Sequence, residues 1–118
     1  MVKFNIPGRP VPKQRPRVGR NGNIYTPRKS REYEKTVARV GRLAFKNPYA
    51  GPVSLQVQIY LASTGNAGDL DNYVKSIQDG LNGIAWQDDR QVIRLKAGIA
   101  VQPGVLERAE ILIKRVPG

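Results

Sequence analysis

A stretch of strict alternation over residues 53–61 places the strongest constraint on the fold of this chain. Apolar side chains recur at every second position from Val53 to Leu61, and Ser54, Gln56, Gln58 and Tyr60 stand between them. Successive side chains of a β-strand point to opposite faces, so this pattern predicts a strand with one buried face. Similar alternation over residues 2–6, 91–102 and 109–114 predicts three further strands.

Two other segments have the spacing of amphipathic helices. One stripe predicts a helix over residues 70–81, with Asp69 at the capping position and Asn82-Gly83 closing it; its members are Leu70, Val74, Ile77 and Leu81. The other predicts a helix from an N-cap at Ser30 to about Lys46; its members are Tyr33, Val37, Val40 and Ala44.

The order of these elements predicts the topology. We expect residues 53–61, the helix 70–81 and residues 91–102 to form a crossover unit, right-handed if its strands are parallel. The last two strands are expected to form an antiparallel hairpin around Pro103-Gly104. Asn21-Gly22 predicts a smaller hairpin between Val18 and Ile24. The predicted fold class is α+β: one mixed sheet of about four strands packed by two helices, with an N-terminal basic loop and hairpin, forming one domain over residues 1–118.

Positive charge is concentrated in the first half of the chain. The sequence has 20 Lys and Arg against 9 Asp and Glu, and all of the net charge of +11 lies in residues 1–50. Such asymmetry indicates a polyanionic partner, with nucleic acid favoured because phosphate contacts release counterions. An anionic membrane is the rival partner, but no apolar face rich in Trp or Phe accompanies the charge.

Three basic segments are candidates for contacting DNA phosphates. Residues 9–17 form a basic arm, rich in proline, with four cations and no acid. The Asn-Gly hairpin and the helix that begins near Ser30 follow it. The candidate residues are Lys13, Arg15, Arg17, Arg20, Arg31, Lys35, Arg39 and Arg42. The alternatives are a flexible solvated loop and a solvated helix face.

The composition excludes several kinds of chemistry. The chain has no Cys and no His, which excludes disulfides, Cys/His zinc sites, thiol nucleophiles and imidazole acid–base catalysis. It has no long apolar run and no signal-like segment, so we expect a soluble, cytoplasmic protein without a membrane partner.

Five of the nine acids cluster within residues 69–89 of this otherwise basic chain: Asp69, Asp71, Asp79, Asp88 and Asp89. The first two lie at a predicted helix start and the last two at a predicted strand start. We expect these two ends to meet at one edge of the sheet. Carboxylates grouped in this way suit Mg²⁺, which prefers oxygen ligands. Taken singly, each has a plainer interpretation as a helix cap, a charge favoured by the helix dipole, an exposed ion pair with Lys75, or a polar turn.

The spacing of this region resembles the RusA family of Holliday junction resolvases. The matching pattern is Asp69-Leu-Asp71-Asn72-x-x-Lys75-x-x-x-Asp79-x-Leu81, followed by Trp86-x-Asp88-Asp89-x-Gln91-Val92. The resemblance implies a homodimeric, Mg²⁺-dependent endonuclease of bacterial or phage origin that nicks four-way DNA junctions symmetrically in recombination and repair. It implies no small-molecule cofactor, and Mn²⁺ is a possible substitute for Mg²⁺.

The resemblance also assigns roles to residues. Asp69, Asp71 and Asp89 are the implied metal ligands and catalytic carboxylates, and Lys75 is the implied essential basic residue of the catalytic site. Asn72, Asp79 and Asp88 are supporting candidates. Two alternatives stay open: a related Mg²⁺ nuclease that cuts flaps or other branched DNA, and a basic nucleic-acid-binding protein without enzymatic activity, in which the acids are structural.

Overall fold

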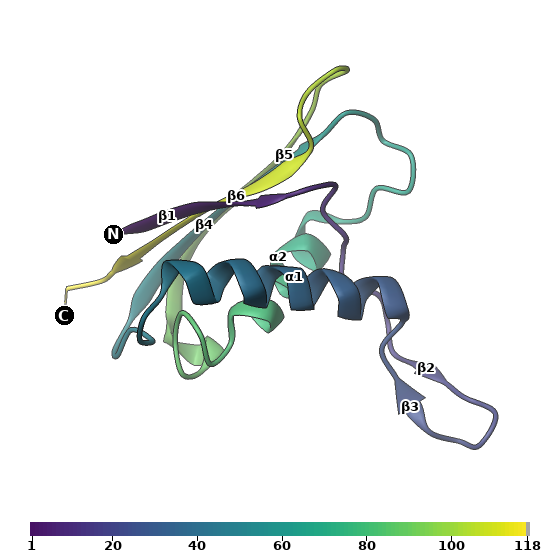
Figure 1. Ribbon diagram of the computed structural model, residues 1–118, viewed down its shortest axis with the longest axis horizontal. Helices are drawn as coiled ribbons and strands as arrows, with labels where there is room; N and C mark the ends of the chain where they lie inside the picture. The colour runs from purple at the N-terminus through teal and green to yellow at the C-terminus, as the bar shows by residue number, and fades with distance from the viewer. Residues whose placement is uncertain (118) are drawn as a thin grey trace.

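The computed structural model describes residues 1–117 and contains a four-stranded mixed sheet with two helices on one of its faces (Figure 1). The sheet has the order β1-β6-β4-β5, and the hairpin β2–β3 stands apart from it. The elements are β1 (Val2–Pro7), β2 (Arg17–Val18), β3 (Ile24–Tyr25), α1 (Arg28–Ala44), β4 (Val53–Leu61), α2 (Leu70–Leu81), the 3₁₀ turn η1 (Asp89–Gln91), β5 (Val92–Val101) and β6 (Arg108–Arg115). The predicted α+β fold is confirmed; residue 118, part of the expected domain, lies outside the described residues.

The core lies between the sheet and the two helices. Every apolar position of the alternation in β4 is buried, and β6 adds Ala109, Ile111 and Ile113 beside it. The helices close the core with Val37 of α1 and Ile77 of α2, both fully buried. The polar positions of β4 point to the opposite face of the sheet, which neither helix covers (Figure 1).

The strand order confirms one topological expectation and contradicts another. β4 and β5 are parallel and α2 connects them, as predicted. The expected hairpin of the last two strands is wrong, because β6 pairs with β4 and β1 and not with β5. The burial patterns explain this arrangement. The inward side chains of β6 are all buried, which suits an interior strand, whereas Ile93 and Leu95 of β5 are exposed, as at a sheet edge.

The start of α1 also differs from the prediction. Pro27 precedes the first helical residue, Arg28, and Ser30 lies inside the first turn instead of capping it. Proline suits a helix start because the first turn does not need its N–H. The buried Ser30 hydroxyl instead accepts a hydrogen bond from the Gln14 N–H (2.9 Å) and donates one to the Pro12 carbonyl (3.3 Å). Ser30 therefore fastens the basic arm to α1.

Two glycines let the helices cross closely. A Cβ atom at Gly80 of α2 would lie 2.7 Å from Val37, and one at Gly41 of α1 would lie 2.7 Å from Leu81. At Gly80 the nearest atoms include the Val37 Cβ and, at 3.0 Å, the Glu34 carbonyl, so only glycine permits this backbone separation, whereas at Gly41 the nearest atom is the movable end of the Leu81 side chain. α1 is consequently fixed against the helix that carries the candidate acidic residues.

Candidate active site

The start of α2 presents two carboxylates to solvent. Asp69 stands at the N-cap with an extended backbone (φ −75°, ψ 150°), and its side chain makes no capping hydrogen bond. Asp71 lies in the first turn, and both residues are exposed. Negative charge at this end of a helix is favoured by the helix dipole. The carboxylate oxygens therefore face outward at a place that tolerates their charge.

Asp71 borders an open groove of about 670 Å³ between α2 and β5. The wall on α2 carries polar groups from Asp71, Asn72, Lys75 and Gln78, and β5 contributes apolar Leu95 and Ala97. Three of the residues that the sequence singled out, Asp71, Asn72 and Lys75, are therefore gathered on one wall. An anion in this groove would contact the Lys75 ammonium and the Asn72 amide and would lie against the apolar side chains of β5.

A network of ion pairs lies behind this wall. The Lys75 Nζ is 3.1 Å from the Asp79 Oδ1, one helical turn away, so its partner is Asp79 and not Asp71. Asp79 also pairs with Lys13 (3.0 Å), and Lys13 with Glu34 of α1 (2.9 Å). Burial lowers the pKa of Lys13, but its hydrogen bonds to Glu34 and Asp79 raise it more, so the net pKa is above the ordinary value.

The basic arm carries less free charge than its sequence suggests. Lys13 has two acidic partners, and Arg9 pairs with Glu107 and donates to the Gly65 carbonyl. The expectation that no acid neutralises the arm is therefore wrong for two of its cations, because the acids come from distant parts of the chain. Arg15 and Arg17 are exposed.

The arm lies directly beside the start of α2. The Lys13 N–H donates to the Asn72 carbonyl (2.9 Å), and a Cβ at Gly68 would lie 2.7 Å from Pro12. The Tyr73 hydroxyl accepts a hydrogen bond from the Gly68 N–H (3.2 Å), which holds the loop that enters the site. The positioning roles of Gly68 and Tyr73 were not predicted from the sequence. The one sequence feature that pointed to them is the small residue immediately before Asp69.

The second acidic pair forms a compact turn before β5. The Asp88 carboxylate accepts from the Arg90 N–H (2.9 Å), and the Gln91 side-chain oxygen accepts from the Asp88 N–H (3.1 Å), which together make a capping box. The backbone bond from Arg90, aided by its guanidinium, lowers the pKa of Asp88. The Gln91 amide donates to the carbonyls of Tyr49 and Gly51 (both 2.8 Å) and so fixes the turn near the start of β4.

Asp89 is oriented by Trp86. The indole is fully buried, and its Nε1–H donates to the Asp89 Oδ1 (2.7 Å). One carboxylate oxygen is therefore held by the core, and the other is free to accept another ligand. This contact gives Trp86 a positioning role that sequence patterns did not reveal.

The two acidic ends do not meet within one protomer. β4 and β5 are parallel, with Val53 opposite Val92 and Leu61 opposite Val101, so η1 lies where β5 begins, whereas the chain enters α2 from the end where β4 finishes. Asp71 borders a groove that Leu95 and Ala97 also line, and these are roughly 10 and 16 Å from Val92 at about 3.3 Å per residue of strand. Among residues 1–117 no three acidic side chains gather as a metal site. The expectation that the two acidic ends meet is wrong. Because β4 and β5 are parallel, the connection between them must return the chain to the end of the sheet where both strands begin.

The remaining predicted DNA contacts lie on exposed surfaces. The four candidate cations of α1 are all exposed: Arg31, Lys35, Arg39 and Arg42. Arg20 is exposed near the tip of the β2–β3 hairpin. Their roles stay predictions. Within residues 1–117 no helix has the length and apolar character needed to cross a membrane.

Comparisons with known proteins place this geometry in context. The family profile described as "Endodeoxyribonuclease RusA" matches residues 7–114. A relative in Bacillus subtilis (strain 168), named "Uncharacterized protein YqaN", is 31% identical over 141 aligned positions that cover 98% of this chain and 96% of the relative. The similarity to both spans nearly the whole chain.

Proposed function

Since the chain belongs to the RusA family of endodeoxyribonucleases, we propose that it is a Mg²⁺-dependent enzyme that resolves four-way DNA junctions by paired symmetric nicks in recombination and repair. The observation that carries the proposal is the groove in which Asp71, Asn72 and Lys75 stand together at the start of α2. In this proposal residues 1–118 act as one domain, and Mn²⁺ can replace Mg²⁺.

The carboxylates fit a hard divalent cation. Asp69 and Asp71 are exposed, and Asp89 has one oxygen left after its bond to Trp86. Mg²⁺ prefers one or two carboxylates, with water and phosphate oxygens completing its coordination. Bound there, it would supply Lewis acidity at the scissile phosphate and a lowered pKa for the attacking water.

A two-fold homodimer would unite the two acidic ends. β5 is the last strand of the sheet order, and its exposed apolar residues Ile93, Leu95 and Val101 suit a covered edge. Antiparallel pairing of two β5 strands centred between Arg94 and Leu95 would set Val92 of each strand opposite Ala97 of the other. Asp89 of the partner subunit would then approach the groove that Asp71 borders, forming two sites related by symmetry. Two such sites are what paired nicks require.

In this proposal Lys75 binds the phosphate that is cut. It forms an i,i+4 ion pair with Asp79, and its own side chain is 55% exposed, so the pair contributes little stability. Asp79 keeps its contact with Lys13 when Lys75 turns away, and it shares that lysine with Glu34. Lys75 is therefore free to stabilise charge that develops on the phosphate. Asn72 adds an amide to the same wall, and Asp88 holds the turn that presents Asp89.

The decisive experiment mixes two inactive variants. Asp71→Asn and Asp89→Asn proteins are each assayed on a mobile four-way DNA junction with Mg²⁺ and with EDTA, and are then mixed, unfolded and refolded together. If the site is shared, each variant alone is inactive, and the mixed dimer regains one intact site that makes single nicks. A mixture of Asp71→Asn with Asp69→Asn is the matched control and stays inactive.

Other outcomes identify the alternatives. Full activity of Asp71→Asn would remove that residue from the active site. Faster cleavage of flap DNA than of the junction would favour a nuclease for other branched DNA. Tight junction binding without cleavage under any divalent metal would favour a binding protein whose acids are structural.

A further inference from the structure

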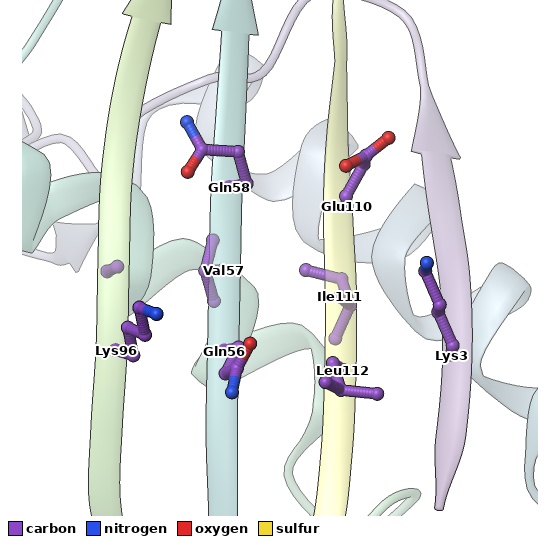
Figure 2. A pocket seen from close by; sticks show the side chains of 9 residues that line it. Lys3, Gln56, Val57, Gln58, Lys96, Glu110, Ile111 and Leu112 are labelled. Atoms are coloured by element: carbon purple, nitrogen blue, oxygen red, sulfur yellow. The ribbon is translucent and has the colours of Figure 1, made fainter.

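The face of the sheet opposite the helices is open. Side chains at alternating positions of all four strands project from it, and no helix among residues 1–117 packs on it (Figure 1). Figure 2 shows part of this open face, with Gln56 and Gln58 on β4 in the middle and Lys96 and Lys3 on the two outer strands. The face consists mainly of polar side chains.

The open face is strongly basic. Four of its cations are exposed: Lys3, Arg94, Lys96 and Lys114. The only carboxylate on the four strands is Glu110, which pairs with Arg108 at 3.1 Å, so it neutralises none of these four cations. Arg108 in turn stacks on Tyr60, with its guanidinium 4.0 Å from the ring centre. None of these residues takes part in the proposed active site.

The arrangement of these groups suits a phosphate backbone. Two adjoining hollows, of about 290 and 320 Å³, share Gln56 and Lys96; Lys3 borders the first, and Arg94 and Lys114 border the second. Lys3 and Lys96 are three strand spacings apart, roughly 14 Å, which is close to the major-groove width of B-DNA, about 12 Å. The amides of Gln56 and Gln58 between them provide further donors. Protein interfaces are typically depleted in Lys at their centre, which disfavours a protein partner.

We propose that the open face binds the phosphate backbone of a DNA duplex, as a second DNA surface distinct from α1 and the basic arm. This inference rests on the proposed function in one respect: the duplex is an arm of the branched substrate. A junction has several arms that leave the crossover in different directions, so contacts on two faces of a protomer can engage different arms. Phosphate contacts of this kind position DNA without reading its sequence.

The first test measures salt dependence. The variant Lys3→Gln/Lys114→Gln, on β1 and β6 away from the proposed dimer edge, is made in the Asp71→Asn background and bound to a four-way junction over a range of salt concentrations. Each lost phosphate contact should reduce the slope of log K against log [salt] by about 0.9, so the expected loss is about 1.8. The matched control is Lys29→Gln/Lys46→Gln, which removes the same charge from exposed positions that are neither on the open face nor among the eight candidate phosphate contacts. Equal slopes for the two double variants would overturn the inference.

The second test locates the DNA directly. The chain has no cysteine, so a single Gln56→Cys substitution can carry a photoreactive crosslinker on the open face. Crosslinking to a junction arm is expected there and not from the control Asn47→Cys, in the exposed turn before β4. The absence of a crosslink between position 56 and DNA would contradict the proposal. A crosslink that only an acidic protein suppresses would contradict it as well.

The two proposals fail in different ways. Normal Mg²⁺-dependent cleavage by a protein whose open-face variants bind like the control would refute the second DNA surface and leave the nuclease. A reduced salt slope and a crosslink in a protein that cuts no DNA would refute the nuclease and leave the surface.

Discussion

At the scale of single residues, the hydroxyl of Tyr33 destabilises the folded state. It is buried without a hydrogen-bond partner, and burial, with a smaller effect of Tyr73, raises its pKa. Tyr33→Phe should therefore raise the free energy of unfolding by about 1 kcal/mol, measured by urea denaturation. Tyr73→Phe is the matched control and should lower stability, because it removes the acceptor of the Gly68 N–H. A loss of stability in Tyr33→Phe would contradict this.

Lys13 should make stability depend on alkaline pH. Its pKa is raised above the ordinary value of 10.5, so its stabilising effect is complete below that pH and is lost as pH rises through the folded-state pKa. Lys13→Gln should cost about 1–2 kcal/mol at pH 7, since it leaves Glu34 and Asp79 without their shared cation, and should reduce the fall in stability above pH 10.5.

The control for Lys13 is Arg28→Gln, which breaks a highly exposed pair with Glu32. Unfolding curves between pH 7 and 11 should show little change for this variant. Identical pH profiles for Lys13→Gln and the parent protein would show that Lys13 does not link these carboxylates in solution.

Local chemistry was more predictable than distant partners at this scale. The position of Asp69 at the start of α2 follows from its immediate neighbours, and the structure places it at the N-cap. The pairing of Lys13 with Asp79 joins residues that are far apart in sequence, and no periodicity encodes it. The assignment of Asp69, Asp71 and Asp89 as ligands depends on the family pattern and awaits the mixing experiment.

At the scale of secondary-structure elements, the crossing of α1 and α2 depends on glycine. A Cβ at Gly80 would lie 2.7 Å from Val37 and 3.0 Å from the Glu34 carbonyl, and backbone cannot yield as a flexible side chain can. Gly80→Ala should therefore destabilise the protein by about 1–3 kcal/mol in thermal or urea unfolding. Gly65→Ala, where the nearest atom is 3.8 Å away, should be nearly neutral. Equal stability of the two variants would mean that the helices can separate without cost.

Periodicity predicted the elements better than their order. The alternation over residues 53–61 and the stripe over residues 70–81 gave the bounds of β4 and α2. The position of β6 between β1 and β4 could not be read from alternation, because each strand pattern is compatible with several neighbours. The predicted start of α1 was wrong because Ser30, a residue type that often caps helices, instead binds the backbone of the basic arm.

At the scale of the whole molecule, the edge of β5 should control assembly. Leu95 is 53% exposed and stands on the edge strand beside the groove. Leu95→Lys places a charge in the proposed dimer interface and should shift the protein from dimer to monomer in sedimentation, with loss of junction cleavage. Leu43→Lys, at an exposed position of α1, should leave the dimer intact. A dimeric Leu95→Lys protein would locate the interface elsewhere.

Metal binding should be coupled to that assembly. A ligand that binds only the folded protein at about one hundred times its Kd raises the free energy of unfolding by about 2.7 kcal/mol. Mg²⁺ should give such an increase in the parent protein, and much less in Leu95→Lys or Asp71→Asn. EDTA should reverse the effect in a thermal-shift measurement. An equal Mg²⁺ effect in the monomeric variant would show that one protomer holds the metal alone.

The parallel arrangement of β4 and β5 has a consequence for how the activity is controlled in a cell. It places the carboxylates of α2 and of η1 at opposite ends of the crossover, so in the proposed dimer each newly made chain carries only half of a cutting centre. At concentrations well below the dimer Kd, the amount of competent enzyme would then rise with the square of the amount of protein. Under this proposal a sparse supply of chains would leave the chromosome intact, and cleavage would begin only above a threshold of expression.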